Sequence, residues 1–164
     1  MEIYTDFSKL FELFETHRGA LYSKNENRGS GNRYGFPKYK GAVYGMTKER
    51  VSKKVGLSYM SRKFPIIYKE LLRIGNDICP FEFNSIQVNR NLVCPKHIDK
   101  SNVGKSLLVS FGNYEGCNIV IGGVEYDAFH RPVIFDGAKI EHWNTPLETG
   151  IKYSLVFFKS NYEK

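Results

Sequence analysis

The chain has 164 residues, of which 41% are hydrophobic, 15% aromatic and 25% charged, and its formal net charge is +7. This composition suits a globular protein with a buried core, whereas no apolar run approaches the roughly 20 residues of a membrane-spanning helix. With no secretory signal in residues 1–6 and three cysteines without a CxxC pair, we expect an intracellular monomer, cytoplasmic or nuclear, that forms no disulfides and contacts no membrane.

The first half of the chain predicts helices. Apolar side chains spaced i, i+3, i+4 and i+7 predict an amphipathic helix over residues 6–17. These side chains are Phe7, Leu10, Phe11 and Phe14. The Gly- and Asn-rich residues 23–35 predict a mobile loop, and residues 41–44 predict a short strand. Pro65 favours the start of another helix, which Gly75 is expected to end.

Positive charge is concentrated in residues 18–63, which hold 12 Lys and Arg against two Glu. Aromatic residues lie between these cations: Tyr22, Tyr34, Phe36, Tyr39, Tyr44 and Tyr59. Cations neutralise phosphates and flat rings stack on bases, so this segment predicts a surface for DNA or RNA. A basic face that only aids solubility is the alternative. The individual candidates for this surface are Arg33, Tyr34, Lys38, Tyr39, Lys40 and Arg50.

After Pro80 the sequence changes to short β-rich runs separated by turn residues. The runs are 81–93, 106–111, 118–121, 124–126, 132–135 and 151–159. Gly112-Asn113 is among the expected turns. Strands in this number without a helix between them predict a β-sandwich or jelly roll. We therefore expect an α+β fold in which residues 1–164 form one domain. Its helical, basic half (1–80) would pack on a β half (81–164).

Three candidate metal ligands occur in the β half. His97 and Asp99 are two residues apart, so in an extended segment both side chains leave on the same side. His142 follows after several expected strands. Two imidazoles and one carboxylate form the facial triad of non-haem Fe(II), which leaves positions open for substrates.

A cation follows on the last expected strand. Lys152 and Ser154 share one strand face, and the apolar residues between and after them cover the other. If that face lies inside the roll, Lys152 is a buried ammonium that needs an anionic partner. A dicarboxylate that chelates the metal at its other end would supply one. The alternative is a lysine whose head reaches solvent at a sheet edge.

This arrangement resembles the Fe(II)/2-oxoglutarate-dependent dioxygenase superfamily over residues 81–160. There a double-stranded β-helix, a form of jelly roll, carries HxD…H followed by R/K-x-S. The segment FGNYEG (111–116) is similar to the turn into the strand that follows HxD in these enzymes. The segment PVIFDG (132–137) is similar to the stretch that precedes their second histidine. Residues 89–106 most resemble the ten-eleven-translocation/J-binding-protein group and its viral and phage relatives. These enzymes oxidise the methyl groups of thymine or 5-methylcytosine.

The resemblance implies a role for each candidate residue. The ligands of Fe(II) would be His97, Asp99 and His142. The cosubstrate would be 2-oxoglutarate, and the oxidant would be dioxygen. Lys152, helped by Ser154, would bind the distal carboxylate of 2-oxoglutarate. Asn89 and Asn91 either hydrogen-bond the cosubstrate or satisfy neighbouring backbone groups. Trp143 either lines the substrate pocket or belongs to the core.

Three functional hypotheses remain open at this point. The first is a dioxygenase that hydroxylates a nucleic-acid base, of the thymine or 5-methylcytosine type. The second keeps the chemistry but takes a protein side chain, such as Pro, Lys or Asn. The third is a non-catalytic jelly roll that binds nucleic acid. Two side chains near the motifs have simpler expected roles. His130 is expected at an exposed turn, and Cys94 either approaches the metal or fills space as a small apolar side chain.

Overall fold

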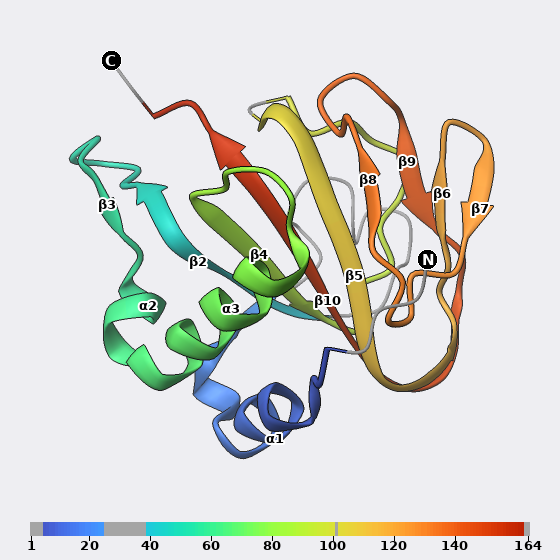
Figure 1. Ribbon diagram of the computed structural model, residues 1–164, viewed down its shortest axis with the longest axis horizontal. Helices are drawn as coiled ribbons and strands as arrows, with labels where there is room; N and C mark the ends of the chain where they lie inside the picture. Colours follow the sequence, from blue (N-terminus) through green and yellow to red (C-terminus); the bar gives the residue numbers. More distant parts are fainter. Residues whose placement is uncertain (1–4, 25–38, 101, 163–164) are drawn as a thin grey trace.

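The computed structural model describes residues 5–24, 39–100 and 102–162. In these residues the helices are α1 (Ser8–Thr16), the short 3-10 helix η1 (Arg18–Ala20), α2 (Tyr59–Lys63) and α3 (Pro65–Ile78). The strands are β1 (Tyr22–Lys24), β2 (Tyr39–Lys48), β3 (Val55–Leu57), β4 (Ser85–Arg90), β5 (Asn102–Gly116), β6 (Ile119–Ile121), β7 (Val124–Tyr126), β8 (Val133–Phe135), β9 (His142–Asn144) and β10 (Leu147–Ser160). Figure 1 shows their arrangement.

The strands form two antiparallel sheets. The larger sheet has the order β1-β2-β4-β10-β5-β8, with β3 also paired to β2, and the smaller sheet has the order β7-β6-β9. An apolar cluster joins them: Leu108 of β5 packs with Ile119 and Ile121 of β6 and with Phe135 of β8. The expected α+β fold with a double-stranded β-helix is therefore confirmed.

The N-terminal half contributes more strand than its sequence suggested. β2 spans Tyr39–Lys48 instead of four residues, and it pairs with β4 over six residues. Ala42 and Tyr44 are buried on the helix side, while Val43 lies on the other face. The two halves of the chain therefore share one sheet, because β2 provides apolar side chains in a strand alternation next to β4.

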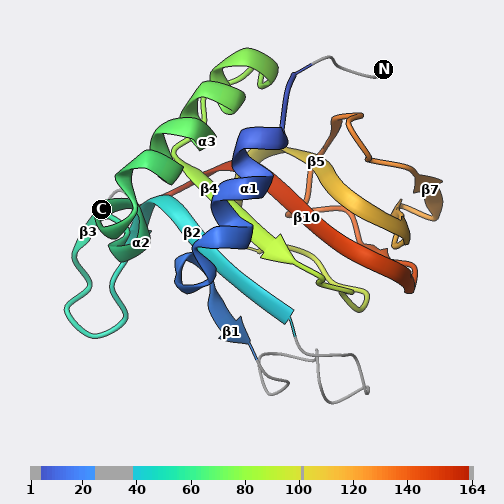
Figure 2. The same cartoon turned by 90° about the horizontal axis from the view of Figure 1, so that it is seen from below.

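Helices α1 and α3 cover one face of the larger sheet (Figure 2). The core beneath them takes Leu10 and Phe14 from α1, Ile67, Leu71 and Ile74 from α3, and alternate residues of β2, β4, β5 and β10. Tyr153, Leu155 and Phe157 of β10 are fully buried on this side. The alternate residues of β10, which include Lys152 and Ser154, therefore point to the other face of the sheet, into the roll.

Two expected breaks are absent. Gly75 does not end α3, which continues to Ile78; a Cβ at Gly75 would lie 2.5 Å from the ring of Phe83 and 2.7 Å from that of Phe157. Gly112 is not in a turn, because β5 continues through it in unbroken register with β10. Both glycines serve close approach within an element instead of ending one.

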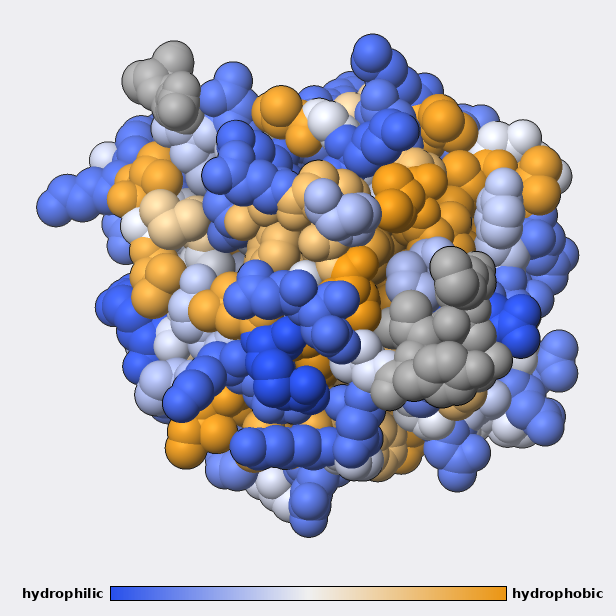
Figure 3. All heavy atoms as spheres, in the orientation of Figure 1, coloured by the Kyte–Doolittle hydropathy of each residue, from blue (hydrophilic) through white to orange (hydrophobic). Residues whose placement is uncertain are grey.

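The surface gives no sign of a membrane span. No helix in the described ranges is both long and apolar enough to cross a bilayer. On the face seen in Figure 3, mostly polar side chains cover α1, and the broadest apolar area lies on the side of β8.

Candidate metal centre and cosubstrate cavity

Backbone pairing brings His97 and His142 together. They form an isolated antiparallel bridge in which each N–H donates to the other residue's carbonyl, both at 3.0 Å. Directly paired residues point to the same face of a sheet. Their ring centroids are accordingly 4.3 Å apart.

Asp99 completes the cluster. Its Oδ1 lies 3.3 Å from His97 Nε2 and its Oδ2 lies 3.2 Å from His142 Nε2. The three ligand atoms all lie within 4.8 Å of one another. The Asp99 N–H donates to the Gly137 carbonyl at 2.7 Å, and a Cβ at Gly137 would lie only 2.9 Å from Asp99 Oδ2. A residue without a side chain is therefore needed beside the carboxylate.

Both histidines present the same nitrogen to this cluster. His97 Nδ1 donates to the Pro95 carbonyl and His142 Nδ1 donates to the Ile140 carbonyl, each at 2.8 Å. A carbonyl only accepts, so Nδ1 carries a proton in each ring and Nε2 is the nitrogen that faces Asp99. In the neutral ring this Nε2 has the lone pair that binds a metal. Such hydrogen bonds fix the ring orientation of metal-binding histidines.

The electrostatics of the cluster favour a cation. Burial would lower the pKa of His97, but the hydrogen bonds to Asp99 and Cys94 raise it well above its usual range. Burial likewise opposes the charge on Asp99, yet its hydrogen bonds to both histidines lower its pKa. Two imidazole nitrogens and a carboxylate oxygen in this arrangement fit non-haem Fe(II).

Lys152 is buried without a carboxylate partner. Its side chain is 5% exposed, and its ammonium donates to the Cys117 carbonyl at 2.7 Å and to Cys117 Sγ at 3.2 Å. Its Nζ also lies 5.6 Å from the centroid of the Tyr114 ring. Among the described residues it forms no ion pair. A buried cation with only neutral neighbours favours an anionic ligand.

One cavity of about 1060 Å³ joins the triad to Lys152. Apolar side chains line it between them: Leu92, Leu108, Ile119, Phe135 and Val156. From there it continues across β10, β4 and β2 to a mouth beside β3 and α2. The mouth is lined by Glu49, Lys54, Tyr59 and Arg62, whereas Tyr22, Lys24 and Tyr39 line the same cavity at the other end of β2, where β1 pairs with it. The Tyr59 ring is half exposed at the mouth, with Arg62 Cζ 5.9 Å from its centroid.

No protein-family model matches the chain, and no curated protein is similar in sequence. Solved structures do match. NgTET1 in complex with 5mC DNA has a TM-score of 0.61 and 12% identity, over 97% of this chain and 70% of that one. An oxidoreductase of the 2OG-Fe(II) oxygenase family from Burkholderia pseudomallei has a TM-score of 0.56 and 16% identity, over 92% and 78%. A prolyl-4-hydroxylase from Pseudomonas putida has a TM-score of 0.54 and 11% identity, over 98% and 91%.

The chain has the fold of the 2OG-Fe(II) oxygenases. At these identities the likeness concerns the fold, and the triad and the buried lysine are properties of this chain. Its His-Asp-His group lies where the two sheets of that fold meet, between β9 and the segment before β5.

The two asparagines differ in this oxygenase fold. Asn89 is 7% exposed and lines the cavity, and its Oδ1 accepts from Gln87 Nε2 at 3.0 Å. Its Nδ2 has no hydrogen-bond partner in the described part of the chain. Asn91 instead uses its Oδ1 to accept from the backbone N–H of Lys152 at 2.8 Å. Asn91 therefore holds the backbone of β10, which was one of its two expected roles.

The residues expected on a nucleic-acid surface are scattered. Arg33, Tyr34 and Lys38, and most of the loop expected at 23–35, lie outside the described residues. Tyr39 lines the cavity, whereas Lys40 does not; Arg50 is exposed in the turn after β2. Tyr44, one of the interleaved aromatics, is fully buried, and its hydroxyl donates to the Ala20 carbonyl at 2.8 Å.

Three other side chains near the motifs are now located. Trp143 does not line the cavity: it follows His142 on β9 and so points to the opposite face, where Lys96 Nζ lies 4.6 Å from its ring centroid. His130 is in a turn as expected but half buried, because its ring stacks on Phe129 at 4.2 Å. Cys94 lines the cavity, with Sγ 4.0 Å from His97 Nε2.

Two residues close to Lys152 and Ser154 were not anticipated. Ser110 lies on the cavity face of β5 and Tyr114 lies above Lys152. The alternation of β5 contained a signal for Ser110, since Ser106, Leu108 and Ser110 share a parity and the residues between them are all apolar. The contact of Tyr114 with Lys152 had no sequence signal, because it depends on the register of two distant strands.

Proposed function

We propose that this protein is an Fe(II)- and 2-oxoglutarate-dependent dioxygenase that hydroxylates a nucleic-acid base, at a methyl group of the thymine or 5-methylcytosine type. One observation carries the proposal. A complete His97–Asp99–His142 triad shares a cavity with Lys152, a buried ammonium with no carboxylate partner among the described residues. A dicarboxylate bound to the metal at one end and to Lys152 at the other satisfies both ends.

Each residue has a definite task in this proposal. When bound, Fe(II) supplies dioxygen activation coupled to the conversion of 2-oxoglutarate to succinate and CO₂. His97, Asp99 and His142 hold the metal through two Nε2 atoms and one carboxylate. Lys152 neutralises the distal carboxylate, and the Nδ2 of Asn89, held in place by Gln87, faces the cavity as a hydrogen-bond donor.

The apolar wall between the metal ligands and Lys152 excludes water. Leu108, Ile119 and Phe135 form part of this wall, and each is buried. In such a dry environment the attraction between the ammonium and a carboxylate is much stronger than in water. The wall therefore orients the cosubstrate and protects the oxidising chemistry from solvent.

The cavity mouth supports nucleic acid as the substrate class. Tyr59 presents a half-exposed ring there, with Arg62 and Lys63 within 6 Å of its centroid, and Lys54 also lines the mouth. Rings of this kind stack on bases while the cations contact phosphates. NgTET1, a protein of the same fold, was solved with 5mC DNA, which favours a base over other substrates.

The experiment is a combined test of metal binding and product formation. Purified protein is loaded with Fe(II) without oxygen, and the metal bound per chain is measured; we expect one ion, and none with Asp99→Ala. Protein, ascorbate and 2-oxoglutarate are then incubated with DNA, RNA or a peptide library, and the nucleosides and peptides are analysed by mass spectrometry.

We expect succinate together with a gain of one oxygen on a pyrimidine nucleoside. A gain on a peptide instead would transfer the chemistry to a protein side chain, as in a prolyl-4-hydroxylase, whose fold is also similar. Full activity in Asp99→Ala would refute the metal site.

A further inference from the structure

One buried polar atom stands out in the roll. Ser110 is 1% exposed, and its Oγ is the only buried side-chain nitrogen or oxygen of the described residues without a hydrogen-bond partner. Such unpaired groups are rare in folded proteins because they lose their bonds to water without replacement. The hydroxyl of Ser110 therefore has an unused donor and unused lone pairs.

The strand register places this hydroxyl beside the proposed cosubstrate pocket. Ser110 on β5 is directly opposite Ser154 on β10, and Gly112, two residues along β5, is opposite Lys152. Opposed residues share a face, and Ser154 and Lys152 both line the cavity. Strands β5 and β10 lie side by side in Figure 1.

Tyr114 links Ser110 to the ammonium of Lys152. The Tyr114 ring centroid lies 5.6 Å from Lys152 Nζ. Burial raises the pKa of Tyr114 to about 12, and the nearby side chain of Ser110 partly opposes the increase. The side chain of Tyr114 thus interacts with both Ser110 and Lys152. Ser110 and Lys152 therefore both lie next to Tyr114 on the inner face of the sheet.

The ammonium also retains bonding capacity. It carries three N–H donors, and its two hydrogen bonds go to the carbonyl and the Sγ of Cys117. One N–H of Lys152 and the hydroxyl of Ser110 therefore have unused bonding capacity on the same face of the sheet. A group that accepts from both at once, and that also compensates a buried positive charge, is a carboxylate.

We propose that Ser110 is a positioning residue for the cosubstrate: its hydroxyl donates to the distal carboxylate that Lys152 neutralises. The inference rests on the proposed function only in taking that carboxylate to belong to 2-oxoglutarate. Because Ser110 touches the end of the ligand remote from the metal, its contribution depends on the second carboxylate and is independent of the 2-oxo acid end.

The experiment measures binding and needs no turnover. Calorimetry compares the wild type and Ser110→Ala, both loaded with Mn(II), for 2-oxoglutarate and for 2-oxopentanoate, the same five-carbon 2-oxo acid without the second carboxylate. We expect Ser110→Ala to weaken 2-oxoglutarate binding by roughly tenfold and to leave 2-oxopentanoate unchanged. Ser110→Thr keeps a hydroxyl and is expected to retain part of the affinity.

Thermal unfolding of the ligand-free protein separates this role from a structural one. Removing an unpaired buried hydroxyl relieves a cost, so Ser110→Ala should unfold at the same temperature as the wild type or higher. Ser106→Ala is the matched control. Ser106 has the same parity on β5 and is fully buried, but its Oγ accepts from Asn102 Nδ2 at 3.2 Å. We expect Ser106→Ala to lower stability and to leave dicarboxylate affinity unchanged.

Several results would overturn the inference. Unchanged 2-oxoglutarate affinity in Ser110→Ala would mean that the hydroxyl holds only a buried water, and equal weakening of both ligands would mean general damage to the pocket. Metal-free protein titrated with glutarate gives an independent reading. If the triad binds no metal yet glutarate still binds less tightly to Ser110→Ala, the proposed function fails and the role of Ser110 stands.

Discussion

The ligands of the triad are oriented by backbone groups. Both histidine Nδ1 atoms donate to carbonyls two residues earlier in the chain, and the Asp99 N–H donates to Gly137. The three ligand atoms thus depend on the backbone at Pro95, Gly137 and Ile140, and not on rotatable side chains. Changes to that backbone, or to the space beside it, should alter metal affinity even though none of these residues binds metal.

Gly137→Ala tests this dependence. The φ of Gly137 is not in the left-handed region, so alanine is compatible with the backbone, but its Cβ would lie 2.9 Å from Asp99 Oδ2. We expect the displaced carboxylate to raise the dissociation constant for Mn(II) by about 10- to 100-fold, as for other changes next to a metal ligand. Gly19→Ala, with no heavy atom within 4 Å of the added Cβ, should bind Mn(II) like the wild type. Equal affinity in Gly137→Ala would show that the carboxylate adjusts freely.

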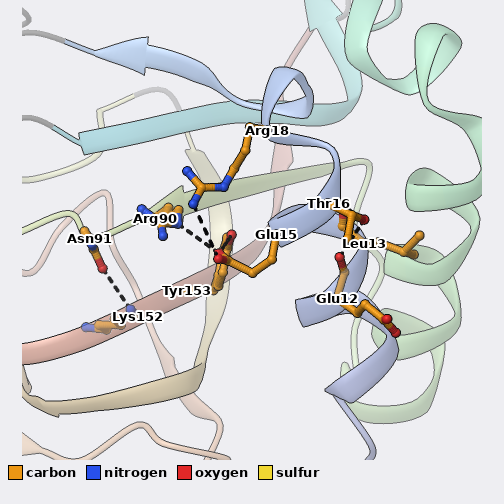
Figure 4. A network of polar contacts seen from close by, with 9 residues as sticks. All are labelled: Glu12, Leu13, Glu15, Thr16, Arg18, Arg90, Asn91, Lys152 and Tyr153. Carbon is orange, nitrogen blue, oxygen red and sulfur yellow. Dashed lines mark hydrogen bonds and ion pairs between the residues drawn. The ribbon is translucent and has the colours of Figure 1, made fainter.

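Glu15 attaches α1 to the strands that carry the proposed cosubstrate site. Its Oε2 accepts from Arg90 Nε on β4 at 3.1 Å and from the Tyr153 hydroxyl on β10 at 2.5 Å, and Arg18 lies near its Oε1 (Figure 4). Burial favours the neutral acid, but these donors and charges outweigh it and lower the pKa of Glu15. Since Tyr153 precedes Ser154 and follows Lys152, this contact also restrains the backbone of the cavity wall.

Glu15→Gln should make the protein less stable and less sensitive to acid. A carboxylate whose pKa is depressed in the folded state stabilises it above the unfolded-state pKa, and that contribution is lost as the pH falls through the folded value. We expect the free energy of unfolding to fall by about 1–3 kcal/mol at pH 7. The difference from the wild type should shrink and disappear as the pH falls through the depressed pKa of Glu15 in the folded state. Urea unfolding at several pH values measures both effects. Glu12→Gln, on the exposed side of α1, is the control, and a pH-independent difference would contradict the argument.

Helix α3 approaches the sheet most closely at Gly75. Alanine is favoured over glycine in a helix by about 1 kcal/mol, whereas a Cβ at 2.5 Å from Phe83 and 2.7 Å from Phe157 overpacks the core, at a cost of about 1–3 kcal/mol. The packing cost prevails because both contacts are to rings within a packed cluster. We expect Gly75→Ala to lower the free energy of unfolding by up to about 2 kcal/mol.

Chemical denaturation checks the Gly75→Ala prediction, with Asn76→Ala as the control. Asn76 is exposed on the same helix, so its replacement gains helix propensity without a packing cost. A more stable Gly75→Ala protein would show that the phenylalanine rings shift without strain.

Across the whole molecule, the basic charge of the sequence is only partly gathered at the cavity mouth. Lys54 and Arg62 line it together with Tyr59, Lys24 lines the same cavity at the other end of β2, and Arg50 lies outside the cavity. The triad and the mouth belong to one continuous cavity of about 1060 Å³. A single strand whose phosphates contact these cations would therefore have one base in reach of the metal ligands.

Salt dependence measures this contact. Each phosphate neutralised on a single strand contributes a slope of about −0.7 to the plot of log K against log salt concentration. Three cations thus predict a slope of about −2 for a labelled single-stranded oligonucleotide followed by anisotropy, and the pair Lys54→Gln, Arg62→Gln should reduce its magnitude by about 1.4. Lys139→Gln, an exposed change by the smaller sheet, should leave the slope unaltered. A slope near zero for the wild type would contradict a polyanionic substrate.

The sequence by itself predicted the candidate metal ligands, the buried lysine and the class of fold. The sequence shows His97-x-Asp99, His142 and Lys152-x-Ser154 directly. These motifs can be recognised because they depend on the spacing of neighbouring residues and on the alternation of side chains along a strand, which are local properties. The alternation on β10 likewise predicted that Lys152 points into the roll, as its burial shows. The amphipathic α1 and the start of α3 at Pro65 followed from equally local rules.

Tertiary structure decided what depends on strand register and on packing between distant segments. The pairing of His97 with His142, the neutral surroundings of Lys152 and the unpaired hydroxyl of Ser110 all arise where residues far apart in the chain meet. The same holds for Gly75, a helix-ending residue by local rules but a close-packing one in the fold. Local propensities are weak compared with the burial of a shared core, so contacts across the sheets decided these positions.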